Sequence, residues 1–119
     1  RYINFLKNLK NISPLIKKNN YKNIHSWHLF IIKFNFKKLK INFNQILEKF
    51  SKSQINTGLH YYPVHLHKYY KKKYALKKIS LPNTNNLKDS YVSLPLYPGL
   101  SQKDQNYICK VLKSIDIST

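Results

Sequence analysis

The spacing of hydrophobic residues changes along the chain, and each spacing predicts an element. Residues 2–9 place apolar side chains at i, i+3, i+4 and i+7, which predicts a helix with one buried stripe that ends before Pro14. Residues 25–36 are apolar on both faces at their centre, which predicts a strand inside a sheet and not on its edge. A second helix is predicted from Asn42 to about residue 52, because Asn42 and a glutamine three residues later can form a capping box.

The second half of the chain continues this alternation. Residues 55–61 are predicted as a strand, and residues 68–78, the most basic run, as a short irregular helix or loop. A short helix over 83–89 leads to a strand over 91–94 that Pro95 ends. Ser101 and Asp104 then form a capping pair, and a closing helix follows. The apolar face of that helix is expected to consist of Tyr107, Ile108, Val111, Leu112 and Ile115.

This order of elements predicts an α+β fold. The expected architecture is a sheet of about three strands with helices packed on one face. Three short strands are stable only when helices cover them. With 119 residues, the chain is long enough for one small domain with a modest core.

The charge of the chain raises the question of an anionic partner. Lysine and arginine total 22 against 4 acidic residues, a formal net charge of +18, which is typical of proteins that bind nucleic acid or anionic membranes. However, Arg1 is the sole arginine, and proteins that bind phosphates and base edges favour arginine for its planar fork. Nucleic acid is therefore not the expected partner. A small basic RNA-binding protein stays open as an alternative, with the tyrosines and lysines of residues 68–78 stacking bases and neutralising phosphates.

Cysteine content and hydropathy bear on the compartment. Cys109 is the single cysteine and cannot form an internal disulfide, and its helical position fits a buried thiol in a reducing compartment. No apolar run approaches the ~20 residues that span a bilayer. We therefore expect a cytoplasmic chain with no membrane partner.

Candidate binding chemistry is concentrated in residues 57–74. This segment holds three of the five histidines and five of the ten tyrosines. Pro63 excludes a further ladder hydrogen bond, so the segment is expected to leave the predicted strand as a loop. Imidazoles and phenols offer donors and acceptors near neutral pH, and their flat faces suit a sugar or a nucleotide base. The alternative is a surface loop whose tyrosines cover a small core.

Other kinds of site have little support. His60, His65 and His67 have no thiol or carboxylate near them in the sequence, so no metal site is expected. A buried helical thiol is rarely activated, and a catalytic triad needs an acid that this chain scarcely has. The two glycines, Gly58 and Gly99, exclude a glycine-rich phosphate loop.

Several short motifs occur in a characteristic order and spacing. They are Trp27-His28-Leu29-Phe30-Ile31-Ile32, Thr57-Gly58-Leu59-His60-Tyr61, Val64-His65, Lys68-Tyr69-Tyr70, Leu81-Pro82-Asn83-Thr84 and Ser93-Leu94-Pro95-Leu96-Tyr97-Pro98. In this order and spacing they resemble the C-terminal part of the DegT/DnrJ/StrS family of pyridoxal-phosphate sugar aminotransferases, and the resemblance covers about residues 1–115. Within that family they are most similar to the aminotransferase that makes 4-amino-4-deoxy-L-arabinose.

The resemblance implies a domain organisation and an activity. Residues 1–16 would be the end of a linking helix and residues 17–119 the small C-terminal domain of a fold-type I enzyme, with the large N-terminal domain absent. In the family, the lysine that forms the Schiff base and the contacts to pyridoxal 5'-phosphate belong to the large domain. The resemblance therefore implies no catalytic and no cofactor-binding residue in this chain, which would be inert alone. The parent enzyme would be a homodimeric transaminase that moves an amino group from glutamate to a keto-sugar nucleotide.

The resemblance also implies substrate contacts and leaves alternatives. Gln54 stands where the family usually has glycine, and a position after a helix C-terminus often needs a positive φ, which glutamine adopts less readily. A sugar dehydratase of the same family and a remnant that only dimerises stay open. The residues expected on the substrate side are Gly58, His60, Tyr61, His65, Tyr69 and Tyr70.

Overall fold

A three-stranded antiparallel sheet forms the centre of the protein. Its strands are β1 (Ile12–Pro14), β2 (Phe30–Phe34) and β3 (Tyr91–Leu94), in the order β1-β2-β3. In the register, Ile12 faces Phe34 and Phe30 faces Leu94. The central place of β2 confirms the prediction that this strand lies inside the sheet. The computed structural model describes residues 1–15, 26–76 and 81–118.

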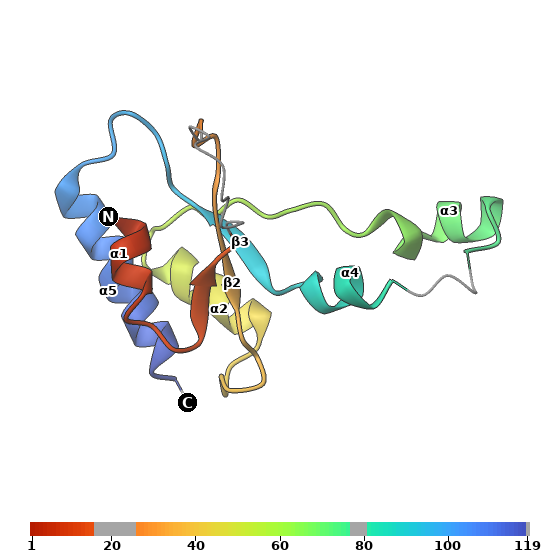
Figure 1. Ribbon diagram of the computed structural model, residues 1–119, viewed down its shortest axis with the longest axis horizontal. Helices are drawn as coiled ribbons and strands as arrows, with labels where there is room; N and C mark the ends of the chain where they lie inside the picture. Colours follow the sequence, from red (N-terminus) through yellow and green to blue (C-terminus); the bar gives the residue numbers. More distant parts are fainter. Residues whose placement is uncertain (16–25, 77–80, 119) are drawn as a thin grey trace, which may run out of the picture.

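Three helices cover one face of the sheet. They are α1 (Tyr2–Leu6), α2 (Phe43–Lys52) and α5 (Gln102–Asp116), and Figure 1 shows α1 beside α5. The alternate residues of β2 are buried under them, which gives the predicted α+β architecture its core. The side chains with almost no exposed surface are Ile12, Ile32, Phe34, Ile46, Phe50, Val92, Leu112 and Ile115.

Both predicted caps are present. At the start of α2 the backbone N–H of Gln45 donates to Asn42 Oδ1 over 3.0 Å, and the N–H of Asn42 donates to Gln45 Oε1 over 2.8 Å. At the start of α5 the N–H of Asp104 donates to Ser101 Oγ over 3.0 Å. These bonds satisfy N–H groups that a helix leaves unpaired at its first turn, which is why the sequence signal was informative.

The strand predicted over 55–61 is wrong. Only Gly58 pairs with the sheet, in an isolated bridge to Ser93 whose two N–H···O bonds are each 2.9 Å long. The third strand is instead β1, where the sequence predicted only a helix end. A β-carbon at Gly58 would lie 3.2 Å from the Cβ of Ser93, so the close approach favours glycine.

Other boundaries also differ from the predictions. The first helix ends at Leu6, three residues early. The strand predicted over 25–36 begins at Phe30, because Trp27 has a positive φ of 53°, which an extended strand does not contain. Residue 25 lies outside the described residues. On α5, Tyr107 is exposed and not part of the apolar face, whereas Cys109 is buried as a free thiol.

Residues 59–76 and 81–90 form an arm that leaves the sheet after Gly58 and returns at β3. The arm contains the short 3₁₀ helix η1 (Val64–Leu66), α3 (Lys68–Lys73) and α4 (Pro82–Leu87). In Figure 1 α3 lies at the far end of the arm, and the molecule extends 50 × 38 × 25 Å. The prediction over 68–78 is thus confirmed for 68–73, while residues 77 and 78 lie outside the described part. None of the helices within the described ranges is long and apolar enough to cross a membrane.

Candidate functional site

A cavity of about 200 Å³ lies at the base of the arm, where its two limbs meet the sheet. We call it the arm pocket. One wall comes from the outgoing limb, and the other from the end of α4 and the start of β3, with Phe43 of α2 also in contact. Its polar and aromatic lining includes His60, Tyr61, Tyr62, Lys88, Asp89 and Tyr91.

The bridge at Gly58 places His60 in this pocket. Nε2 of His60 is 3.0 Å from Ser93 Oγ, and its ring lies over Tyr91 with the ring centroids 4.7 Å apart. Because Gly58 and Ser93 are hydrogen-bonded neighbours, the imidazole two residues further on is brought to β3. Nε2 is thereby engaged, and the second ring nitrogen, Nδ1, can also donate or accept a hydrogen bond.

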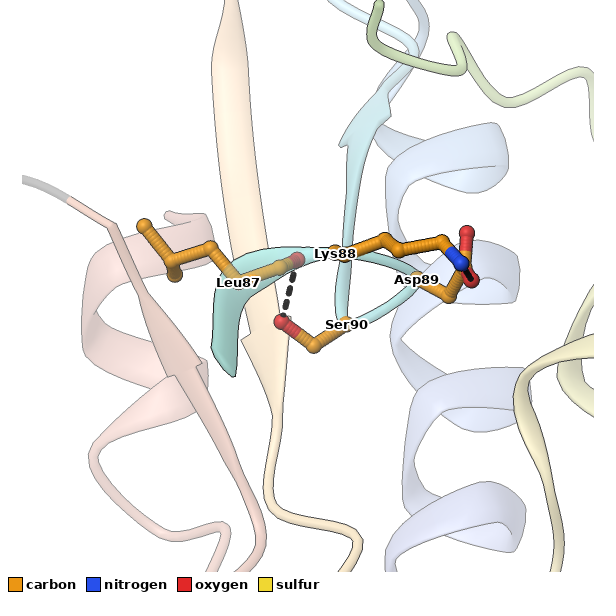
Figure 2. A network of polar contacts seen from close by, with 4 residues as sticks. All are labelled: Leu87, Lys88, Asp89 and Ser90. Carbon is orange, nitrogen blue, oxygen red and sulfur yellow. Dashed lines mark hydrogen bonds and ion pairs between the residues drawn. The ribbon is translucent and has the colours of Figure 1, made fainter. Parts of the chain in front are cut away.

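Lys88 enters the pocket from the returning limb. Its Nζ lies 4.8 Å from the ring centroid of Tyr62 and 3.6 Å from Asp89 Oδ2. Figure 2 shows the Lys88 and Asp89 side chains in contact with each other. It also shows the turn before β3, in which Ser90 Oγ donates to the carbonyl of Leu87 over 2.7 Å. A hydrogen bond to Tyr62 raises the pKa of Lys88, with smaller contributions from the charges of Tyr62 and Asp89. The pocket therefore presents an ammonium group at neutral pH.

The six predicted site residues fall in four places. Gly58 pairs with Ser93 of β3. His60 and Tyr61 line the arm pocket, and Tyr61 is 99% exposed. His65 is buried inside the arm, where its Nε2 is 2.8 Å from Asn85 Oδ1 and so joins the two limbs. Tyr69 and Tyr70 lie on α3 and contact each other edge to face at a centroid distance of 5.2 Å. The structure thus brings His60 and Tyr61 together in the pocket, and Gly58 and the other three residues do not line it.

Sequence reasoning missed the side chains that complete the pocket. Tyr62 lay within the segment rich in tyrosine and histidine but was not singled out, and Lys88 was one lysine among many. Lys88 reaches the pocket because Asp89 turns the chain at a positive φ of 52°, and no periodicity signals such a turn. Ser93 was part of a quoted motif, so its proximity to His60 could have been suspected. Within the described residues, no group of three histidine, cysteine, aspartate or glutamate side chains could hold a metal ion.

The chain is similar to aminotransferases of sugar metabolism. The family model described as "DegT/DnrJ/EryC1/StrS aminotransferase family" matches residues 1–113. An uncharacterized protein of Methanocaldococcus jannaschii, MJ1066, is 36% identical over 104 residues, 87% of this chain and 26% of that protein. The spore coat polysaccharide biosynthesis protein SpsC of Bacillus subtilis is 32% identical over 92 residues, 76% of this chain and 24% of SpsC. The chain therefore spans about a quarter of the length of these curated relatives.

Solved structures agree with the fold. Helicobacter pylori PseC, described as an aminotransferase involved in the biosynthesis of pseudoaminic acid, superposes with a TM-score of 0.76 at 25% identity, over 96% of this chain and 30% of that chain. DesV of S. venezuelae, determined in complex with a ketimine intermediate, gives a TM-score of 0.79 at 22% identity, over 99% of this chain and 30% of DesV. At that identity the likeness to DesV bears on the fold alone.

Proposed function

The chain belongs to the DegT/DnrJ/EryC1/StrS aminotransferase family, and on that premise we propose that it is the C-terminal part of a pyridoxal-phosphate-dependent sugar aminotransferase. The observation that carries the proposal is the family match over residues 1–113. The similarity to SpsC favours a role in polysaccharide biosynthesis. The same match does not favour the alternative of a small RNA-binding protein.

The proposed reaction moves an amino group from glutamate to a keto-sugar nucleotide. Pyridoxal phosphate, when bound, supplies the electron sink for such a transfer. This chain would supply groups on the substrate side: the imidazole of His60 and the phenol of Tyr61 can donate to and accept from sugar hydroxyls. His65 would act through the arm, since its contact with Asn85 holds the two limbs together. Tyr69 and Tyr70, at the far end of the arm, would meet substrate only if the whole protein brings another surface to α3.

The described residues do not fit the cofactor itself. Pyridoxal-phosphate sites require a lysine and a group, commonly a carboxylate, that pairs with the pyridine nitrogen. No described lysine is buried. All four carboxylates are already engaged: Glu48 with Lys52, Asp89 with Lys88, Asp104 with Ser101, and Asp116 with the backbone of Lys10 and Asn11. We therefore place the cofactor on another part of the whole protein and propose that this chain is inert alone.

The finer assignments are also proposals. The whole protein would be a homodimer, and the enzyme of 4-amino-4-deoxy-L-arabinose synthesis stays the relative we favour within the family. We propose the cytoplasm as the compartment, because the single cysteine is a buried free thiol. A sugar dehydratase of the same family is the alternative reaction, and the family match, which is described as an aminotransferase family, does not favour it.

The test uses the longest protein encoded by the reading frame that contains this chain. Purified with pyridoxal phosphate, it should convert the cofactor to its amino form when glutamate is added, and then aminate a nucleotide-linked keto-sugar. The chain of residues 1–119 alone is the control and should leave the cofactor spectrum unchanged. Loss of water from the sugar without use of glutamate would favour the dehydratase. Failure to react with either substrate would contradict both candidates.

A further inference from the structure

Lys88 was not among the site residues predicted from the sequence. It nevertheless supplies the positive charge in the lining of the arm pocket. Resting on the proposed function, we infer that Lys88 binds the diphosphate of the nucleotide sugar in this pocket. The ligand class is a nucleoside diphosphate, with its phosphates at Lys88 and its adjoining sugar toward His60 and Tyr91.

The first support is that the ammonium group of Lys88 can still donate hydrogen bonds to a ligand. Its distance of 3.6 Å to Asp89 Oδ2 is longer than the 2.7–2.9 Å of a charge-assisted hydrogen bond. Asp89 is 61% exposed in its side chain, so water weakens the ion pair further. An ammonium group carries three donors, and the contact with the Tyr62 ring holds the stem over the pocket while a phosphate is bound.

The second support is the charge of the surroundings. From residue 49 to residue 88 the sequence contains no acidic residue, so Asp89 is the only carboxylate that the arm brings to the pocket. The lysines of α3 extend the positive potential along the arm, which attracts an anionic ligand before contact. A lysine suits phosphate as a point charge, without the planar fork of arginine.

The third support is size. A volume of about 200 Å³ is below the range of pockets that enclose a whole drug-sized ligand, so the pocket can take a diphosphate with part of a sugar and not a complete nucleotide sugar. The ring of Tyr62 lies against the ammonium group, and the stacked rings of His60 and Tyr91 line the same pocket. Such a lining suits a sugar ring next to the charged group. The base would then lie outside, near the freely exposed ring of Tyr61.

The test is a titration of the isotopically labelled chain followed by amide NMR signals at His60 and Tyr91. UDP is the probe, with uridine, inorganic pyrophosphate and glutamate as comparisons at one ionic strength. We expect UDP to shift these signals and to bind at least about tenfold more tightly than uridine, the scale of one charge-assisted hydrogen bond. Equal binding of uridine would overturn the inference, as would failure of UDP to bind. Tighter binding of glutamate than of UDP would assign the pocket to the amino donor and also overturn it.

Three variants locate the charge. Lys88→Gln should weaken UDP binding about tenfold. Lys103→Gln is the matched control, since it removes the same charge from the exposed first turn of α5 and should change the affinity by less than about twofold. Asp89→Asn should strengthen binding by about twofold, because a competing carboxylate is removed and asparagine tolerates the positive φ of that position. Equal effects of the Lys88 and Lys103 changes would show that total charge alone attracts UDP, and the inference would fail.

These measurements are independent of amino transfer. If the longer protein shows no transaminase activity while UDP still binds through Lys88, the proposed function fails and the subsite stands. If the longer protein is a transaminase, Lys88→Gln should raise KM for the sugar nucleotide and leave the half-reaction with glutamate unchanged. An unchanged KM would overturn the inference and leave the proposed function intact.

Discussion

The sheet with its three helices and the arm are held together in different ways. The sheet and helices share one contiguous apolar core, whereas His65 is the only buried residue among the described residues of the arm between 59 and 89. The limbs of the arm are joined by a few polar and ring contacts, such as His65 with Asn85 and Lys88 with Tyr62. Burial therefore stabilises the sheet with its three helices, which we call the body. The arm keeps its imidazoles, phenols and lysines accessible. The residues proposed to contact substrate therefore lie on the region with the fewest buried side chains.

The largest effect should come from the body. Leu112 is fully buried on α5, and Leu112→Ala should lower the free energy of unfolding by about 3 kcal/mol, through lost transfer energy and a cavity. Tyr74→Ala, at the end of α3 where the ring is 57% exposed, should change it by less than about 0.5 kcal/mol. Urea denaturation of both variants measures the contrast. Equal losses would show that the arm unfolds with the body as one unit and contributes to its stability.

The next effect concerns the contact that joins the two ends of the body. Asp116 of α5 accepts the N–H of Asn11 at Oδ1 over 2.7 Å and that of Lys10 at Oδ2 over 3.0 Å. Because these bonds are charge-assisted and Asp116 is buried, Asp116→Ala should destabilise the chain by about 2 kcal/mol. Asp104→Ala, at the exposed start of the same helix, is the control and should cost less than about 1 kcal/mol. If the two variants are alike, the Asp116 contact does not hold the ends together.

How far the sequence predicts this molecule also differs between the two regions. The helices α2 and α5, with their caps, followed from periodicity and from side chains that satisfy first-turn N–H groups. Strand β1 was missed because three residues are too short to show an alternation, and it exists only through its pairing with β2. The predicted strand over 55–61 failed because Leu59 is exposed and this segment forms backbone hydrogen bonds with β3 only at Gly58.

The candidate site was predicted only where its residues share a motif. His60 and Tyr61 are adjacent in the sequence and line the arm pocket, two residues after the bridge at Gly58. Lys88 reaches the same pocket from the other limb, through a turn that local sequence does not specify. A contact between Tyr62 and a residue 26 positions later depends on how the arm folds back, and a single sequence carries no signal for it.

A smaller effect in the body depends on pH. Tyr2 is buried, and its hydroxyl donates to the carbonyl of Pro95 over 3.2 Å. Burial, with smaller contributions from Cys109 and Tyr97, raises the pKa of Tyr2 well above the ordinary value for tyrosine. Above a pH of about 10 the unfolded chain ionises Tyr2 while the folded chain keeps it neutral, so stability falls as pH rises. The pH-dependent loss should be smaller in Tyr2→Phe, which should cost about 1 kcal/mol at neutral pH. Urea denaturation from pH 8 to 11 tests this, and identical slopes in both proteins would contradict it.

The smallest effect is a stabilisation at the end of α2. Gln54 has a positive φ of 55°, as its place after a helix C-terminus suggested. The N–H of Ile55 donates to the carbonyl of Phe50 over 2.9 Å, and the N–H of Gln54 to that of Ser51 over 2.9 Å, the two bonds of a Schellman motif. The side chains of Ile55 and Phe50 are both buried, which completes its hydrophobic contact.

Glycine adopts this backbone conformation without the steric cost that a β-carbon imposes. Gln54→Gly should therefore raise the free energy of unfolding by about 0.5 kcal/mol. The substitution relieves the strain in the folded state, but part of this gain is lost because glycine increases the conformational entropy of the unfolded chain. The matched control is Gln45→Gly inside α2, which should lose about 1 kcal/mol or more because it also removes the capping contact to Asn42. Urea denaturation measures both variants. A loss of stability in Gln54→Gly would show that the glutamine side chain makes a stabilising contact that outweighs the strain of its positive φ.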